Sequence, residues 1–122
     1  MDQLKELEET FLEEYLSAEL LENDAKYKAA TILFSKAVFA LADYIILKKY
    51  RILPKNHAER FRILERREPE LYLLLDKLWS EYTRTYNKPA ARESISLLKE
   101  VIKKISKNES LSQKIKACFE KA

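Results

Sequence analysis

Glycine is absent from this chain of 122 residues. Loops that cradle phosphate groups, whether of the Walker type or the dinucleotide-binding type, need glycine because the backbone must approach the ligand closely. The absence therefore excludes most nucleotide-enzyme folds.

Cysteine and histidine occur once each. These are too few for a thiolate zinc site or a multi-histidine centre within one chain. We expect no metal and no cofactor, although a Mg²⁺ ion held by carboxylates alone would leave no such signal. Cys118 falls in the last helical stretch, where a small buried thiol is expected rather than a nucleophile.

Long apolar runs and targeting signals are also missing. The first residues, MDQLKELEET, are acidic and lack the cationic head and apolar run of a signal peptide. The most apolar segment, residues 32–47, carries Lys36 and Asp43 and is short for a membrane span. We therefore expect a cytoplasmic protein without a membrane partner. A charged fraction of 35% and the missing glycine suggest a heat-adapted source.

Apolar residues recur at three- and four-residue steps, the spacing of amphipathic helices. The first stripe runs from Leu4 to Leu21. A second helix, starting near Ala25, is so apolar that we expect it to be buried nearly all round. Further stripes predict a third, a fourth and a fifth helix, and the capping box of Ser110 with Gln113 predicts a short sixth. The sequence thus predicts one all-α domain over 1–122, an antiparallel up-and-down bundle of four to five core helices plus a short C-terminal helix.

Prolines and capping residues set the expected helix boundaries. The expected breaks are Pro54, Pro69, Asn87 and Pro89. The expected caps are Asp24 for the second helix, Asn56 with Glu59 for the third, and Ser110 with Gln113 for the sixth.

Two segments carry a recognisable order of features. The run LLENDAKYKAATILFSKAVFALADYIILKKYRILPKNHAERFRIL has a leucine pair, a turn, a long helix with spaced alanines and a Pro-Lys-x-His helix start. This order resembles that of the HEPN domain family, and the run LDKLWSEYTRTYNKP is similar to the family's last core helix. Together the resemblance covers roughly residues 18–106.

The resemblance implies a helical bundle that is usually dimeric. Some HEPN domains are metal-independent ribonucleases, often toxins neutralised by a nucleotidyltransferase partner. Others are inactive and bind nucleotides or RNA, or serve as dimerising modules. The ribonuclease signature is an Arg followed four to six residues later by a His on the last core helix. Arg84 stands at the expected place, but no His follows it, and an Arg alone supplies no base for the 2′-hydroxyl.

The only histidine, His57, is separated from Arg51 by five residues and so satisfies the same spacing. The two residues fall at the join between the second and third helices, not on the last core helix. A helix N-terminus also favours the neutral imidazole. We therefore interpret His57 as a structural residue at the start of a helix and expect no catalytic residue.

Asp43 is the acidic residue of the apolar second helix, and a buried carboxylate needs a cation or several donors. We expect Arg84 to pair with it. Such a pair would either be structural or would hold Arg84 toward a phosphate. The candidate residues for binding nucleotide or phosphate are Asp43, Tyr82, Arg84, Tyr86 and Lys88.

The charges are unevenly spread along the chain. Nine acidic residues crowd residues 2–24, and basic residues crowd residues 48–67. The basic patch candidates are Lys48, Arg51, Lys55, Arg60 and Arg62. Such a cluster could follow a nucleic-acid backbone, be a solvated surface matched by nearby glutamates, or dock a second subunit or partner protein.

Three functions therefore remain open. The favoured one is a non-catalytic HEPN-like homodimer that binds nucleotide or RNA, with pairing to a nucleotidyltransferase in a toxin–antitoxin system left open. The second is a pure dimerisation or scaffold module. The third, a metal-independent ribonuclease toxin, is disfavoured because no His follows Arg84.

Overall fold

A computed structural model of the chain describes residues 2–87, 92–108 and 110–120. These residues form six helices and no strand, which confirms the predicted all-α fold. The helices are α1 (Gln3–Asn23), α2 (Tyr27–Tyr50), α3 (His57–Arg67), α4 (Pro69–Asn87), α5 (Arg92–Ile105) and α6 (Gln113–Glu120).

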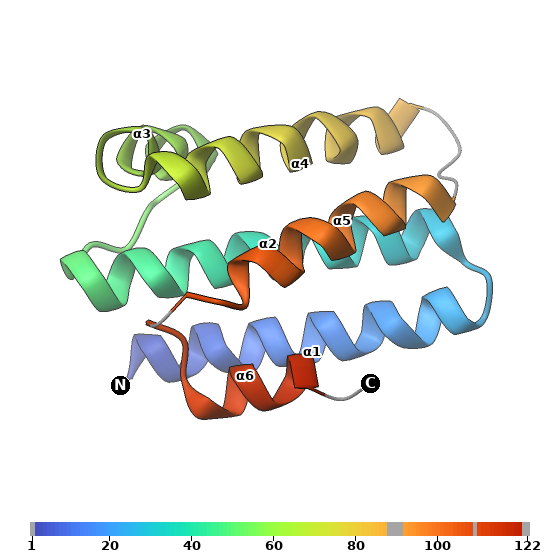
Figure 1. Cartoon of the computed structure of the whole chain (residues 1–122), viewed down its shortest axis with the longest axis horizontal. Coiled ribbons are helices and arrows are strands. Elements are labelled where there is room, and N and C mark those ends of the chain that lie inside the picture. The colour runs from blue at the N-terminus through green and yellow to red at the C-terminus, as the bar shows by residue number, and fades with distance from the viewer. Residues whose placement is uncertain (1, 88–91, 109, 121–122) are drawn as a thin grey trace.

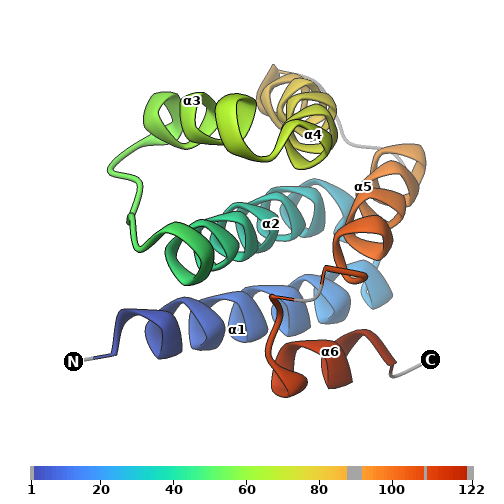
Figure 2. The same cartoon turned by 60° about the vertical axis from the view of Figure 1, so that its left-hand side comes forward.

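The long helices α1, α2, α4 and α5 run alternately in opposite directions and form an up-and-down bundle (Figure 1). The short α3 lies at the end of α2 and leads into α4. After α5 the chain turns back, and α6 packs beside α1 (Figure 2). Segments from the two ends of the chain therefore lie side by side.

Helix α2 is the centre of the bundle, because it contacts α1, α3, α4 and α5. Residues 37–46 are all buried, so this helix is enclosed nearly all round as its sequence predicts. The stripe of α1 packs against it through Phe11, Tyr15 and Ala18. Cys118 in α6 is buried, as expected.

By length and composition alone, α2 could cross a membrane: it has 24 residues and an apolar window with a mean hydropathy of 1.8. The core helix of a soluble protein passes the same test, and 72% of this window is buried inside the bundle. The apolar run is thus part of a longer helix than residues 32–47 suggested. Burial against the other helices accounts for its composition.

The connections confirm some expected caps and correct others. Asn56 caps α3, since its side chain accepts a hydrogen bond from the Glu59 backbone N–H at 2.9 Å. Asp24 does not cap α2; it ends α1, and α2 begins after Lys26 without a side-chain cap. The cap of α6 is Ser112, not Ser110, because the Ser112 hydroxyl accepts from the Ile115 N–H.

Two turns have left-handed backbone conformations at residues other than glycine. Ala25, between α1 and α2, has φ 58°, and Arg51, just after α2, has φ 60°. Such conformations cost an L-residue about 1 kcal/mol. Helix α2 therefore ends at Tyr50, before Pro54, and Arg51 after it takes the conformation that glycine usually supplies at helix ends.

Candidate functional site

The buried charges of the bundle meet where α3 packs on α2. Arg60 donates from Nε to Asp43 Oδ1 at 2.7 Å and from Nη2 to Oδ2 at 2.9 Å. Both residues are 8% exposed. This two-pronged geometry satisfies both charges and is the strong form of a carboxylate–guanidinium pair.

The partner of Asp43 is thus Arg60, and the predicted Asp43–Arg84 pair is wrong. The inclusion of Arg60 in a basic surface patch is wrong for the same reason. The expected burial of Asp43 predicted that its carboxylate needs a cation. It could not choose among the many arginines, because that choice depends on how α3 folds back onto α2.

His57 is the first residue of α3, as predicted. Its Nδ1 contacts Arg60 Nη1. An arginine can only donate, so Nδ1 must accept and the imidazole proton must lie on Nε2. Partial burial and the Arg60 charge lower the pKa of His57, and Asp43 opposes them.

Aromatic rings surround this ion pair. The His57 ring lies 5.0 Å from the Phe39 ring and 4.6 Å from the Trp79 ring. The Arg60 guanidinium lies 5.2 Å from the centroid of the Phe39 ring. Tyr82, a predicted ligand-binding residue, is 8% exposed and packs against Phe39 and Trp79. The cluster therefore joins α2, α3 and α4 as part of the core.

Arg84 belongs to a different cluster. Its Nη2 donates to Glu81 Oε2 at 2.7 Å and to the Ser94 hydroxyl at 2.8 Å. The pKa of Glu81 is lowered, mainly by the hydrogen bond from Arg84. The Arg84 side chain is 47% exposed, so part of it is held between α4 and α5 and the rest faces solvent. The Tyr86 side chain and Lys88 lie outside the described part of the chain.

The remaining basic patch candidates are exposed. They are Lys48, Arg51, Lys55 and Arg62. The Lys48 ammonium lies 5.6 Å from the centroid of the Tyr44 ring. No described cavity is lined by more than one of these four residues, so they form a charged surface rather than an enclosed site.

A second basic cluster, which the sequence analysis missed, lines a groove of about 490 Å³ between α1, α5 and α6. We call it the lysine groove. Its residues are Tyr15, Lys99, Ile102, Lys103, Ser106, Lys107, Lys116 and Phe119. The volume is in the range of small-ligand sites.

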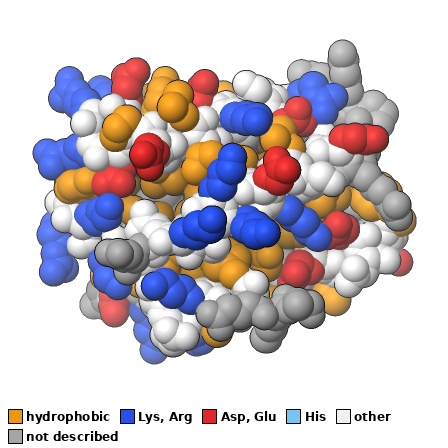
Figure 3. Space-filling model, in the orientation of Figure 1, with side chains coloured by type: hydrophobic (Ala, Val, Ile, Leu, Met, Phe, Trp, Pro, Cys, Tyr) orange, Lys and Arg blue, Asp and Glu red, His pale blue; other side chains and the backbone are white. Residues whose placement is uncertain are grey.

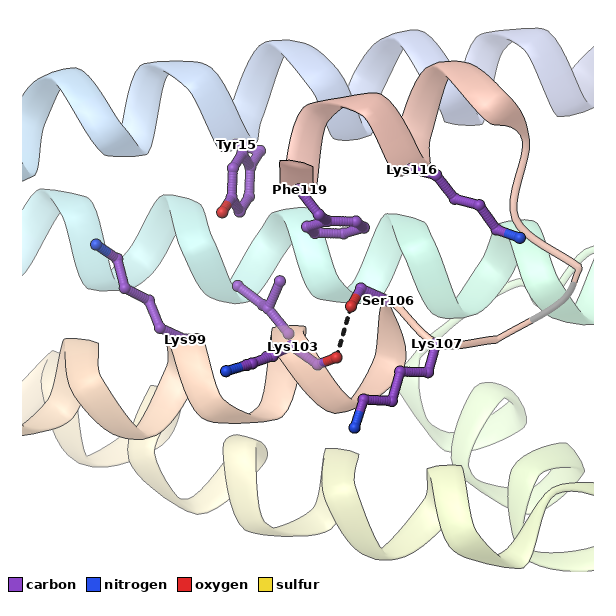
Figure 4. Close-up of a pocket in the computed structure, with 8 residues that line it drawn as sticks. Tyr15, Lys99, Lys103, Ser106, Lys107, Lys116 and Phe119 are labelled. Atoms are coloured by element: carbon purple, nitrogen blue, oxygen red, sulfur yellow. Dashed lines mark hydrogen bonds between the residues drawn. The ribbon is translucent and has the colours of Figure 1, made fainter. Parts of the chain in front are cut away.

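Lys99 and Lys103 lie in α5, and Lys107 lies in the turn that follows it. The four-residue step between Lys99 and Lys103 places them about 6 Å apart along one edge of that helix. The Tyr15 and Phe119 rings, whose centroids are 5.7 Å apart, extend from α1 and α6 toward α5 (Figure 4). The space-filling view shows a band of basic side chains across the middle of this face, with exposed hydrophobic side chains below it (Figure 3). Ammonium groups beside an apolar floor suit a ligand that carries both phosphate and a ring.

Burial and nearby acidic groups shape the electrostatics of this groove. The pKa of Tyr15 is raised to about 12, first by burial and then by Glu19, Cys118 and Glu22. Tyr15 therefore stays protonated and neutral at physiological pH. The lysine spacing was visible in the sequence, but the return of α6 onto α1, which brings Lys116 and Phe119 to the groove, was not.

Neither cluster has the composition of a metal site. Among the described residues, no three His, Cys, Asp or Glu side chains gather closely enough to hold a metal ion.

The chain matches no protein-family model, no curated protein and no solved structure.

Proposed function

We propose that this chain is a non-catalytic helical binding module for nucleotide or RNA. The observation that supports the proposal best is the lysine groove, where Lys103, Lys107 and Lys116 stand beside the Tyr15 and Phe119 rings. Lysines neutralise phosphates without reading sequence, and aromatic rings stack on any base. Arg84, with its outer side exposed, remains a second contact for phosphate.

Two contacts favour binding over cleavage. Metal-free cleavage of RNA needs a base and a cation next to one another. His57 and Arg60 do touch, but the imidazole Nδ1 of His57 accepts a hydrogen bond from the Arg60 guanidinium. Asp43 neutralises the positive charge of that guanidinium. The His57 ring therefore offers a donor, Nε2–H, and no free basic nitrogen.

The proposal includes membership of the HEPN family, a homodimeric state, a cytoplasmic location and a possible nucleotidyltransferase partner. A pure dimerisation module is the second candidate. It is favoured by Leu16 and Leu20, which lie one turn apart on α1 and are 42% and 71% exposed. Leucines in such positions suit burial against another subunit.

Titration of a labelled uridine oligonucleotide and of labelled ATP over a series of salt concentrations tests the binding function. For the oligonucleotide, we expect saturable binding and a slope of about −2 for log K against log salt, because each of three lysines contributes about −0.7 with a single strand. The Lys103→Ala/Lys107→Ala variant should reduce the slope to about −0.7. Gel analysis of the RNA in EDTA should show it intact.

The matched control is Lys5→Ala/Lys28→Ala, which removes two exposed charges from α1 and α2. If both double variants weaken binding equally, net charge and not the groove attracts the ligand. If neither ligand binds saturably, the dimerisation module replaces the binding function. RNA cleavage that is lost in Arg84→Ala would instead support the ribonuclease.

A further inference from the structure

The lysines of the groove are not equivalent. Lys99 Nζ lies 2.6 Å from Glu22 Oε1 on α1. None of Lys103, Lys107 and Lys116 forms an ion pair with a carboxylate in the described residues. One end of the groove is therefore neutralised by the protein's own carboxylate, and the other end is open to an anion.

The position of Glu22 is not explained by its own helix. It lies in the last turn of α1, where the helix dipole disfavours negative charge. No basic residue of α1 lies in that turn to offset this cost. The partner of the carboxylate is Lys99, from α5. Glu22 also lines a second hollow, together with Asn23, Ala25, Tyr27 and Ser96, and reaches the lysine groove through its ion pair with Lys99.

The order of groups along the groove follows from the labelled side chains. Lys99 lies on the Tyr15 side, and the Lys103 side chain extends toward that side (Figure 4). Lys116 lies on the far side of Phe119, and the Lys107 side chain lies below Phe119 in this view. Phosphates can thus be neutralised at one end, while an uncharged ring fits beside the two aromatic rings. A phosphate at the Lys99 end would meet the Glu22 carboxylate.

We propose that Glu22 determines the specificity of the lysine groove by excluding phosphate from its Lys99 end. This inference rests on the proposed binding function and narrows it. The groove accepts ligands whose phosphates are clustered at one end and whose other end is an uncharged ring. It discriminates against a strand whose phosphates continue along its whole length.

The test compares Glu22→Gln with the wild type, using labelled ATP and a labelled uridine oligonucleotide as probes. The amide keeps the size of the side chain and removes its charge. We expect about two- to five-fold tighter binding of the oligonucleotide, the scale of an exposed ion pair. The slope of log K against log salt should become steeper by about 0.7 as Lys99 gains a phosphate. ATP affinity should change less than that of the oligonucleotide.

Glu9→Gln is the matched control, since it removes the same charge from an exposed position of α1. It should leave both affinities unchanged. Adding Lys99→Ala to Glu22→Gln should abolish the gain for the oligonucleotide, whereas Lys99→Ala alone should have little effect.

The outcomes separate this inference from the function on which it rests. If the ligands bind but Glu22→Gln behaves as Glu9→Gln does, the binding function stands and the role of Glu22 is refuted. An equal gain in affinity for ATP and for the oligonucleotide would also refute the role of Glu22, because such a gain would reflect the change in net charge alone. If neither wild type nor Glu22→Gln binds either probe, both proposals fail. If the oligonucleotide binds to Glu22→Gln and not to the wild type, Glu22 excludes the strand from the groove completely.

Discussion

At the scale of single residues, the neighbours of an ionisable group matter together with its exposure. His57 is exposed, yet Arg60 occupies its Nδ1 and two aromatic rings cover part of its imidazole. Asp43 is buried, yet Arg60 satisfies it. Arg60 therefore links the two groups and stabilises the neutral imidazole next to a charged pair.

We expect the pKa of His57 to lie below its ordinary value of 6.5. A lowered histidine pKa means that the unfolded state binds more protons once the pH falls below 6.5. This residue's contribution to stability is thus present above that pH and is lost as the pH falls toward the folded-state pKa. Because the chain has one histidine, NMR titration of its ring protons measures the pKa directly, and nitrogen shifts should place the proton on Nε2.

The control for the stability effect is His57→Gln, which cannot titrate. Its unfolding free energy should depend less on pH between 7 and 5 than that of the wild type, as followed by urea unfolding. A pKa above 6.5 would show that Asp43, and not burial with Arg60, dominates the electrostatics of the ring.

At the scale of helices, α3 is held in the bundle by the Asp43–Arg60 pair, the rings around it and the fully buried Leu64. The far end of α3 is held by a second set of contacts. Tyr50 donates to the Arg67 carbonyl, and Lys49 pairs with Glu68 at 3.1 Å. These outer contacts are more exposed, so the inner ion pair should matter more for the position of α3.

Asp43→Asn should lower the free energy of unfolding by about 3 kcal/mol, because it leaves a buried guanidinium without its counter-ion. Urea unfolding followed by circular dichroism measures the loss. The control is Asp24→Asn, which makes the same chemical change in an exposed pair with Lys26 and should cost less than about 1 kcal/mol. Equal losses would mean that the Asp43–Arg60 pair does not anchor α3.

Replacing both partners, as Asp43→Leu with Arg60→Met, should recover part of the stability, since no unpaired charge stays buried. That recovery would separate the cost of an orphaned charge from a general loss of packing.

The helices were predictable from the sequence because each carries a local signal. Periodic apolar residues predicted the first five helices and a capping pattern predicted the sixth, while Asn56 and Pro69 marked helix starts correctly. The predicted caps Asp24 and Ser110 were wrong. Each lies among several polar residues that could cap a helix, and tertiary contacts determine which of them does. Asp24 ends one helix, and Ser112 replaces Ser110 because its hydroxyl also donates to Glu8.

At the scale of the whole molecule, the candidate sites were predicted poorly because they depend on contacts between distant segments. The lysine groove joins Tyr15 to Lys116 and Phe119, about a hundred residues away in sequence. Nothing local indicates that α6 returns to α1. In the same way, the need of Asp43 for a cation was predictable, but Arg60 as its partner was not.

The exposed leucines of α1 test the proposed homodimer. We expect sedimentation to show a dimer for the wild type and a monomer for Leu16→Glu/Leu20→Glu, because two carboxylates would have to be buried in the interface at large cost. Leu73→Glu is the control: Leu73 is 66% exposed but lies on α4, so the dimer should persist. A wild type that stays monomeric at high concentration would refute the homodimer. If the wild type is a dimer, oligonucleotide binding by Leu16→Glu/Leu20→Glu shows whether the lysine groove of one subunit suffices. A loss of binding in this variant, with the fold intact, would mean that the ligand contacts both subunits.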